Sequence, residues 1–129
     1  MRRRKKMADI VNTQNYNYVY LAQCINVIDG DTIDLDVDLG FDIRMKRRFR
    51  LYGINAYEIV GVSKDSEEYR RGMEAKQLVE SLILNKKIVI ESYKDKTDKY
   101  GRYLAMVYLD DGTCLNSLLV EKGLAVTYE

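Results

Sequence analysis

The sequence predicts a mainly β member of the α+β class: a five-stranded Greek-key barrel of the OB type, with one long helix after the third strand and a short helix near the C-terminus. Three observations favour this fold. Five segments have the length and apolar pattern of strands, a long helical segment separates the third from the fourth, and no repeat or linker divides the chain. With 129 residues, the chain is long enough to bury one core.

The first three strands are predicted at the start of the chain, over residues 19–28, 32–39 and 43–52. Asp29 and Gly30 form a tight turn between the first two strands. In the second strand, apolar side chains alternate strictly with aspartates, so the apolar row faces the core. The other row therefore faces outward and is expected to do no chemistry: Asp34, Asp36 and Asp38.

Residues 53–64 contain two glycines and no clear period, so we expect a loop there. Asp65 or Ser66 can cap the long helix, which is predicted to end near Leu84. The remaining elements are expected in the order strand, strand, short helix, over residues 87–93, 102–109 and 115–122.

The composition removes several kinds of chemistry. Histidine is absent, which excludes a serine nucleophile with a histidine base and removes the usual zinc ligand. Cys24 and Cys114 are the two cysteines, and their separation indicates neither a zinc cluster nor a disulfide framework. An enzyme with this composition would use carboxylates, arginines, tyrosines or lysines, together with a hard metal ion.

The charges are separated along the chain, although the formal net charge is only +1. Residues 2–6 are all basic, residues 44–50 carry five cations, and residues 29–38 are acidic. This pattern is typical of a cation site beside a phosphate-attracting surface, but it also fits ordinary solvated faces.

Residues 1–16 read as a disordered basic arm, or as a tag-like or alternative-start segment before Met7, and residues 17–129 as the folded domain. The sequence shows no signal peptide and no run of transmembrane length. A cytoplasmic monomer without a membrane partner is therefore expected.

Three residues near the predicted turns are candidates for chemistry. Asp31 shares the parity of the buried row, and an inward carboxylate at a barrel mouth requires a cation; a turn-capping role is equally open. Arg50 ends the basic row and matches phosphate in shape and charge; the alternative is one more exposed cation. Glu58 lies in a glycine-flanked loop without a periodic pattern.

The loop TDKYGR, residues 97–102, brings Lys99, Tyr100 and Arg102 together around Gly101. A cluster of cations with an aromatic ring suits a nucleotide, because the ring stacks on a base while the cations bind phosphate. An ordinary lysine-rich hairpin would have the same composition.

Taken together, VIDGDT, RLYGINAYE and TDKYGR closely resemble the motifs of the staphylococcal nuclease (thermonuclease) family. In that family DGDT, R-L-x-x-x-D-T-P-E and DKYGR carry the active site. The resemblance extends from about Val19 to Tyr128 and includes NSLLVEKGLA near the end. It implies an OB-type barrel and calcium-dependent hydrolysis of DNA and RNA phosphodiesters, with little sequence specificity and with 3′-phosphate products.

The resemblance also implies roles by motif position. Asp31 resembles the metal carboxylate, Arg50 and Arg102 the phosphate clamp, and Glu58 the residue that orients or deprotonates the attacking water. Lys99 and Tyr100 resemble the contacts to the substrate. The implied cofactor is Ca²⁺, with another divalent metal possible, and the implied partner is DNA or RNA.

The chain departs from the family pattern beside Glu58. Asn55 replaces the second metal aspartate and Ala56 follows in place of threonine, so we expect a weaker but usable metal site from the Asn55 amide oxygen and the Ala56 carbonyl. Tyr57 replaces proline, which predicts a looser hold on Glu58. Tyr128 is a candidate substitute for a family tyrosine.

A second hypothesis is a catalytically weak or inactive module on the same fold that binds nucleic acid or protein. Loss of the arginines and the glutamate would mark such a copy. Arg50, Glu58 and Arg102 are all present, so the sequence favours the enzyme.

Overall fold

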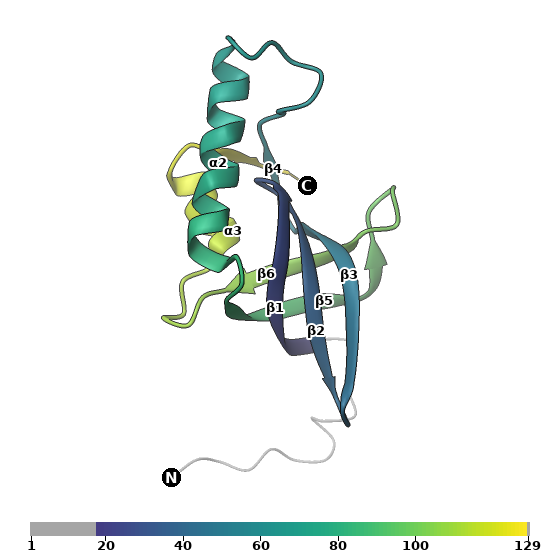
Figure 1. Cartoon of the computed structure of the whole chain (residues 1–129). Helices are drawn as coiled ribbons and strands as arrows, with labels where there is room; N and C mark the ends of the chain where they lie inside the picture. The colour runs from purple at the N-terminus through teal and green to yellow at the C-terminus, as the bar shows by residue number, and fades with distance from the viewer. Residues whose placement is uncertain (1–17, 129) are drawn as a thin grey trace.

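Five strands of the chain close into a barrel (Figure 1). The computed structural model describes residues 18–128, with the backbone alone for residues 94–96; the predicted N-terminal arm lies outside the described residues. The strands are β1 (Tyr18–Asp29), β2 (Thr32–Gly40), β3 (Ile43–Leu51), β5 (Lys87–Thr97) and β6 (Tyr103–Tyr108). They pair in the order β1-β2-β3-β6-β5, and β5 closes the barrel on β1. The predicted five-stranded barrel is confirmed.

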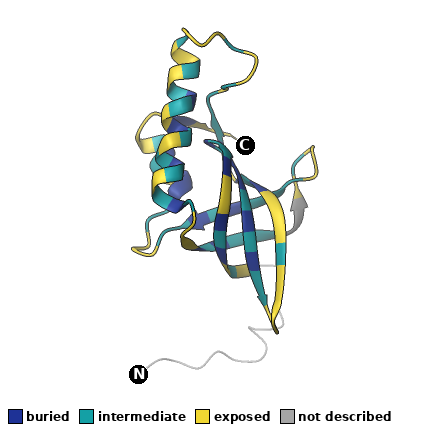
Figure 2. Cartoon of the chain, viewed as in Figure 1, coloured by how far each residue is buried: buried dark blue, intermediate teal, exposed yellow. Residues whose placement is uncertain are grey.

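The alternation along β2 is confirmed by burial. Its apolar row lies in the core, where Ile33 and Leu35 are fully buried, and buried residues alternate with residues of intermediate burial along this strand in Figure 2. The outward aspartates face the cations of β3 in register. Asp34 accepts a hydrogen bond from Arg48 Nε at 2.8 Å, and Asp36 accepts one from Arg44 Nε at 3.1 Å. The acidic and basic runs therefore pair with each other on one face of the sheet.

The expected loop over residues 53–64 is wrong at its beginning. Ile54–Ala56 form strand β4, which pairs antiparallel with β7 (Ala125–Thr127) near the C-terminus. Each strand has three residues, too few to show an alternating pattern, and their partners are about seventy residues apart in sequence. This small sheet fixes the backbone that carries Asn55 and Ala56.

The long helix α2 (Glu67–Ile83) begins at Ser66, whose hydroxyl accepts a hydrogen bond from the Tyr69 N–H at 3.1 Å. The helix packs against β1, and Figure 1 shows it upright beside the barrel. Its buried face is formed mainly by small residues and short aliphatic ones: Gly72, Ala75, Val79 and Ile83. A Cβ atom on Gly30 would lie 2.6 Å from Ala75 Cβ, so the β1–β2 turn rests directly on the helix.

The short helix α3 (Leu115–Glu121) carries a buried polar residue, Asn116. The Asn116 side chain accepts a hydrogen bond from the Val107 N–H and donates two, to the carbonyl oxygens of Tyr52 and Ala105. All of its polar atoms are satisfied, and it ties α3 to the segment that follows β3. Among the described residues, no helix is both long enough and apolar enough to cross a membrane.

Candidate active site

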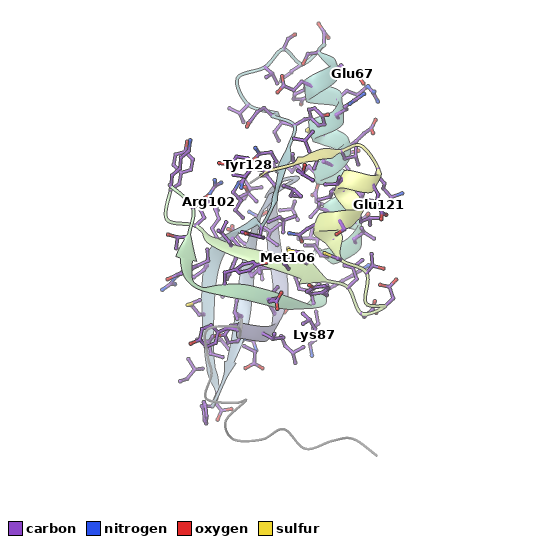
Figure 3. All side chains as sticks on the ribbon, turned by 180° about the vertical axis from the view of Figure 1, so that it is seen from behind. Glu67, Lys87, Arg102, Met106, Glu121 and Tyr128 are labelled. Atoms are coloured by element: carbon purple, nitrogen blue, oxygen red, sulfur yellow. The ribbon has the colours of Figure 1, made fainter. Side chains whose placement is uncertain are left out.

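A cleft of about 680 Å³ lies where the β1–β2 turn, the segment after β3 and the β5–β6 loop meet. It brings together seven of the eight residues singled out from the sequence: Asp31, Arg50, Asn55, Glu58, Lys99, Tyr100 and Arg102. Ala56 reaches the site through its backbone N–H. Figure 3 labels two residues of this cleft, Arg102 and Tyr128. Residues from three separate motifs therefore share one concave surface.

Asp31 lies in the β1–β2 turn with its carboxylate held from several sides. Its Oδ1 atom accepts a hydrogen bond from the Thr32 hydroxyl at 3.0 Å, and its Oδ2 atom accepts one from the Ala56 N–H at 2.9 Å. The side chain is 13% exposed, so these contacts replace much of the water that would solvate the charge. The backbone N–H of Asp31 donates to Asp29 Oδ1, which gives Asp29 the turn-forming role expected of it.

Arg50 is not one more exposed cation, because its side chain is only 11% exposed. Its Nη2 atom donates to the Ile54 carbonyl at 3.0 Å and lies 3.8 Å from Asp31 Oδ2. The Tyr128 ring lies over the guanidinium, with 5.2 Å between its centroid and Arg50 Cζ. The guanidinium is thus oriented at the cleft wall, with its charge beside the Asp31 carboxylate.

Arg102 is oriented by Asp98, a residue that motif reading alone had not singled out. Its Nε donates to Asp98 Oδ2 at 2.7 Å, while the backbone N–H groups of Tyr100 and Arg102 both donate to Asp98 Oδ1 at 2.9 Å. Burial alone would raise the pKa of Asp98, but these hydrogen bonds and the Arg102 charge lower it below its usual value. The position of this aspartate four residues before Arg102 in a glycine turn is the sequence signal that would have identified it.

A side-chain relay links the two halves of the site. Arg102 Nη1 donates to Thr32 Oγ1 at 3.2 Å, and that hydroxyl donates in turn to Asp31. Thr32 is buried, so it serves as a fixed connection between a cation and a carboxylate. Arg102 and Asp31 are therefore held in one hydrogen-bond network.

The remaining predicted residues lie more openly at the cleft. The Glu58 side chain is exposed, and Asn55 is half-buried. Tyr100 is 70% exposed, with Lys99 Nζ 5.1 Å and Arg102 Cζ 5.2 Å from its ring centroid. An exposed aromatic face flanked by two cations has the chemistry to accept a nucleobase and its phosphate.

Asp29 adds a second carboxylate beside Asp31. Burial, together with its contact to Asp31, raises the pKa of Asp29 to about 6. Asp29 and Asp31 both line the cleft, together with Arg50 and Arg102.

A calcium ion is held by several oxygen ligands. Within the described residues, no group of three or more His, Cys, Asp or Glu side chains is placed to hold a metal. Asp31, the Asn55 amide and the Ala56 carbonyl are all oxygen donors, the type that Ca²⁺ prefers. This set fits a hard cation in kind, but it supplies a single formal charge and so fits a weak site.

Comparison with known proteins identifies the family of the chain. Residues 48–129 match the model of a protein family described as staphylococcal nuclease homologue. The chain belongs to the staphylococcal nuclease family. It is 32% identical to a thermonuclease from Staphylococcus hyicus over 93% of its length, 37% identical to a thermonuclease from Staphylococcus intermedius over 77%, and 32% identical to an uncharacterized endonuclease from Escherichia coli O157:H7 over 84%.

The matched part of the chain corresponds to only part of these relatives. It covers 64% of the Staphylococcus hyicus thermonuclease, 54% of the Staphylococcus intermedius thermonuclease and 61% of the Escherichia coli protein.

Proposed function

We propose that this member of the staphylococcal nuclease family is a metal-dependent nuclease that hydrolyses phosphodiester bonds of DNA, RNA or both with little sequence specificity. One observation carries the proposal: Arg50 and Glu58 from one motif and Arg102 from a second line one cleft with Asp31 from a third. Stacking on Tyr100 and contacts to phosphate do not read base edges, so low sequence specificity follows from the residue types.

The two arginines supply the positive charge that the reaction requires. Attack by water on an anionic phosphodiester builds negative charge on the phosphoryl oxygens, and fixed guanidinium groups stabilise that charge. Arg50 and Arg102 are each held by carboxylate, carbonyl or hydroxyl oxygens, so little reorganisation is needed when substrate binds.

Glu58 is proposed as the residue that orients or deprotonates the attacking water, a role that histidine cannot fill in this chain. Its exposed carboxylate faces a cleft with room for a nucleotide and water. Lys99 and Tyr100 are proposed to bind the phosphate and base of the substrate.

We propose Ca²⁺ as the cofactor, held by Asp31 with the Asn55 amide oxygen and the Ala56 carbonyl. When bound, a divalent cation supplies Lewis-acid neutralisation of the phosphate charge. The single carboxylate predicts weaker affinity than a site with two aspartates would have. The folded unit is proposed to be a monomer over residues 17–129; the cytoplasmic location and the absence of a membrane partner stay predictions.

Cleavage assays test this proposal against the rival binding module. Mixed-sequence single-stranded DNA and RNA are incubated with the protein in millimolar Ca²⁺, in Mg²⁺ and with a chelator. We expect fragments of many lengths in Ca²⁺ and none with the chelator. Cleavage that survives the chelator contradicts the metal requirement, and tight binding without cleavage in any metal supports the binding module instead.

A further inference from the structure

We propose that Tyr57 and Arg71 are positioning residues that hold the backbone of Glu58 in place for the reaction. The inference rests on the proposed role of Glu58 as the residue that acts on water. It concerns a contact between α2 and the segment over residues 57–59, which joins β4 to the loop before the helix.

The first support is a double contact between the two side chains. Arg71 Nη1 donates a hydrogen bond to the Tyr57 hydroxyl at 3.2 Å, and Arg71 Cζ lies 5.4 Å from the centroid of the Tyr57 ring. The guanidinium thus reaches both the ring face and its hydroxyl, which restricts the ring more than either contact alone.

The second support is that Arg71 is itself fixed on the helix. Its Nε donates to Glu67 Oε1, one turn earlier, at 3.1 Å. A helix is a rigid element, so the orientation of Arg71 passes to Tyr57 and from there to the neighbouring backbone.

The third support is the close approach of the helix backbone at Gly72. A Cβ atom at this position would lie 2.6 Å from the Tyr57 carbonyl oxygen, 2.5 Å from Ile59 Cγ2 and 3.1 Å from the Glu58 carbonyl oxygen. Glycine therefore allows α2 to lie directly against all three residues of the segment. Tyr57 and Ile59, on either side of Glu58, thus pack against the helix. The Glu58 side chain itself is exposed at the cleft.

These contacts bear on the proline that the family carries at the position of Tyr57. Loss of a proline predicts a looser backbone, and in this chain a ring tied to Arg71 supplies a restraint of another kind. A general base must lie within hydrogen-bond reach of its water, so a small displacement of Glu58 lowers the rate of the chemical step. Substrate affinity depends on other residues, so kcat should change far more than KM.

Arg71→Met tests the inference, with Arg70→Met as its matched control. Arg70 is the adjacent arginine on the same helix and pairs with Glu67 and Glu74, so both variants remove one positive charge and an ion pair with Glu67. We expect Arg71→Met to lower kcat about fivefold with KM within about twofold of wild type, since a base is misplaced but not lost. Tyr57→Phe, which loses the hydrogen bond and keeps the ring, should lower kcat about two- to threefold. Arg70→Met should leave kcat unchanged.

The same substitution in a Glu58→Gln background separates positioning from a general effect on the fold. If Arg71 acts through Glu58, Arg71→Met lowers the residual rate of Glu58→Gln no further. An equal loss in Arg70→Met and Arg71→Met, no loss in Arg71→Met and Tyr57→Phe, or an undiminished loss in the Glu58→Gln background overturns the inference. Absence of metal-dependent cleavage by the wild-type protein overturns the proposed function instead.

Discussion

Asp31 Oδ2 accepts a hydrogen bond from the backbone N–H of Ala56 across 2.9 Å. This bond joins the β1–β2 turn to β4, and it places Asp31 beside the residue that follows Asn55. The proposed oxygen donors for a metal ion therefore come from two segments that the fold holds together. For the proposed metal site, we expect the charge at position 55 to influence the affinity strongly.

Restoring a carboxylate at that position should strengthen calcium binding. Asn55→Asp adds a second formal negative charge to the site, so we expect calcium affinity to rise roughly tenfold, about 1.4 kcal/mol. Calorimetric titration of the protein with Ca²⁺ measures the change. Gln77→Glu, on the exposed face of α2, adds the same charge away from the cleft and should leave the affinity unchanged. Similar affinities for both variants and wild type would contradict the proposed ligand.

Adding a side chain at position 72 should destabilise the fold. In an exposed helix, alanine is about 1 kcal/mol more favourable than glycine. Here the new Cβ would meet backbone and side-chain atoms within 2.6 Å, and we expect Gly72→Ala to lower the free energy of unfolding by about 1–3 kcal/mol. Urea unfolding measures the loss, and Gln77→Ala on the exposed face serves as the control. A more stable Gly72→Ala protein would show that the helix can move away from residues 57–59.

Asp98 should contribute stability that depends on pH. Its folded pKa is lowered, despite partial burial, by hydrogen bonds from Arg102 and Tyr100, so the ionised form is favoured in the folded state. Its contribution is therefore present above the unfolded pKa of about 3.9 and is lost as the pH falls through the lower folded pKa. We expect Asp98→Asn to be about 1–2 kcal/mol less stable than wild type at pH 7, with the difference shrinking in acid.

Unfolding curves at pH 7 and at successively lower pH measure this difference. Asp110→Asn, at an exposed turn, removes one carboxylate without an arginine contact and provides the comparison. A difference that stays constant down to strongly acidic pH would mean that the Asp98 charge is unimportant to the fold.

Arg48, on the outer face of β3, should contribute little to nucleic-acid binding. Arg48 pairs with Asp34 on the outer face of the barrel, whereas Arg102, although paired with Asp98, lines the cleft where substrate is proposed to bind. For a single strand, removing one phosphate contact reduces the slope of log K against log salt by about 0.7. We expect that reduction for Arg102→Gln and none for Arg48→Gln, measured by anisotropy of labelled single-stranded DNA with a chelator present. Equal slopes for both variants would place the binding surface elsewhere.

The barrel was predictable because its strands alternate with period two. In β2, every second residue is apolar, and the buried row matches that pattern down to Val37. The pairing of β4 with β7 was not predictable, because strands of three residues show no period and these two are far apart in sequence. The cap and the end of the long helix were also predictable, but the close approach of Gly72 and Ala75 to the rest of the fold was not.

The site was predictable where a motif names residues and unpredictable where tertiary contacts position them. Arg102 stands out in TDKYGR, but the relay through Thr32 to Asp31 joins residues seventy positions apart. The contact between Tyr57 and Arg71 likewise requires α2 to lie against residues 57–59. Sequence patterns report local periodicity and side-chain chemistry, whereas these contacts depend on how separate elements meet.

The most direct measurement of the central claim is the cleavage rate of Glu58→Gln beside that of Glu68→Gln, on single-stranded DNA in saturating Ca²⁺. Both variants remove one exposed carboxylate, but Glu58 lines the cleft and Glu68 lies on the first turn of α2. The account predicts a loss in kcat of about 10²-fold or more for Glu58→Gln, the range for a proton-transfer group, and a wild-type rate for Glu68→Gln. A Glu58→Gln protein that cleaves DNA at the wild-type rate would contradict it.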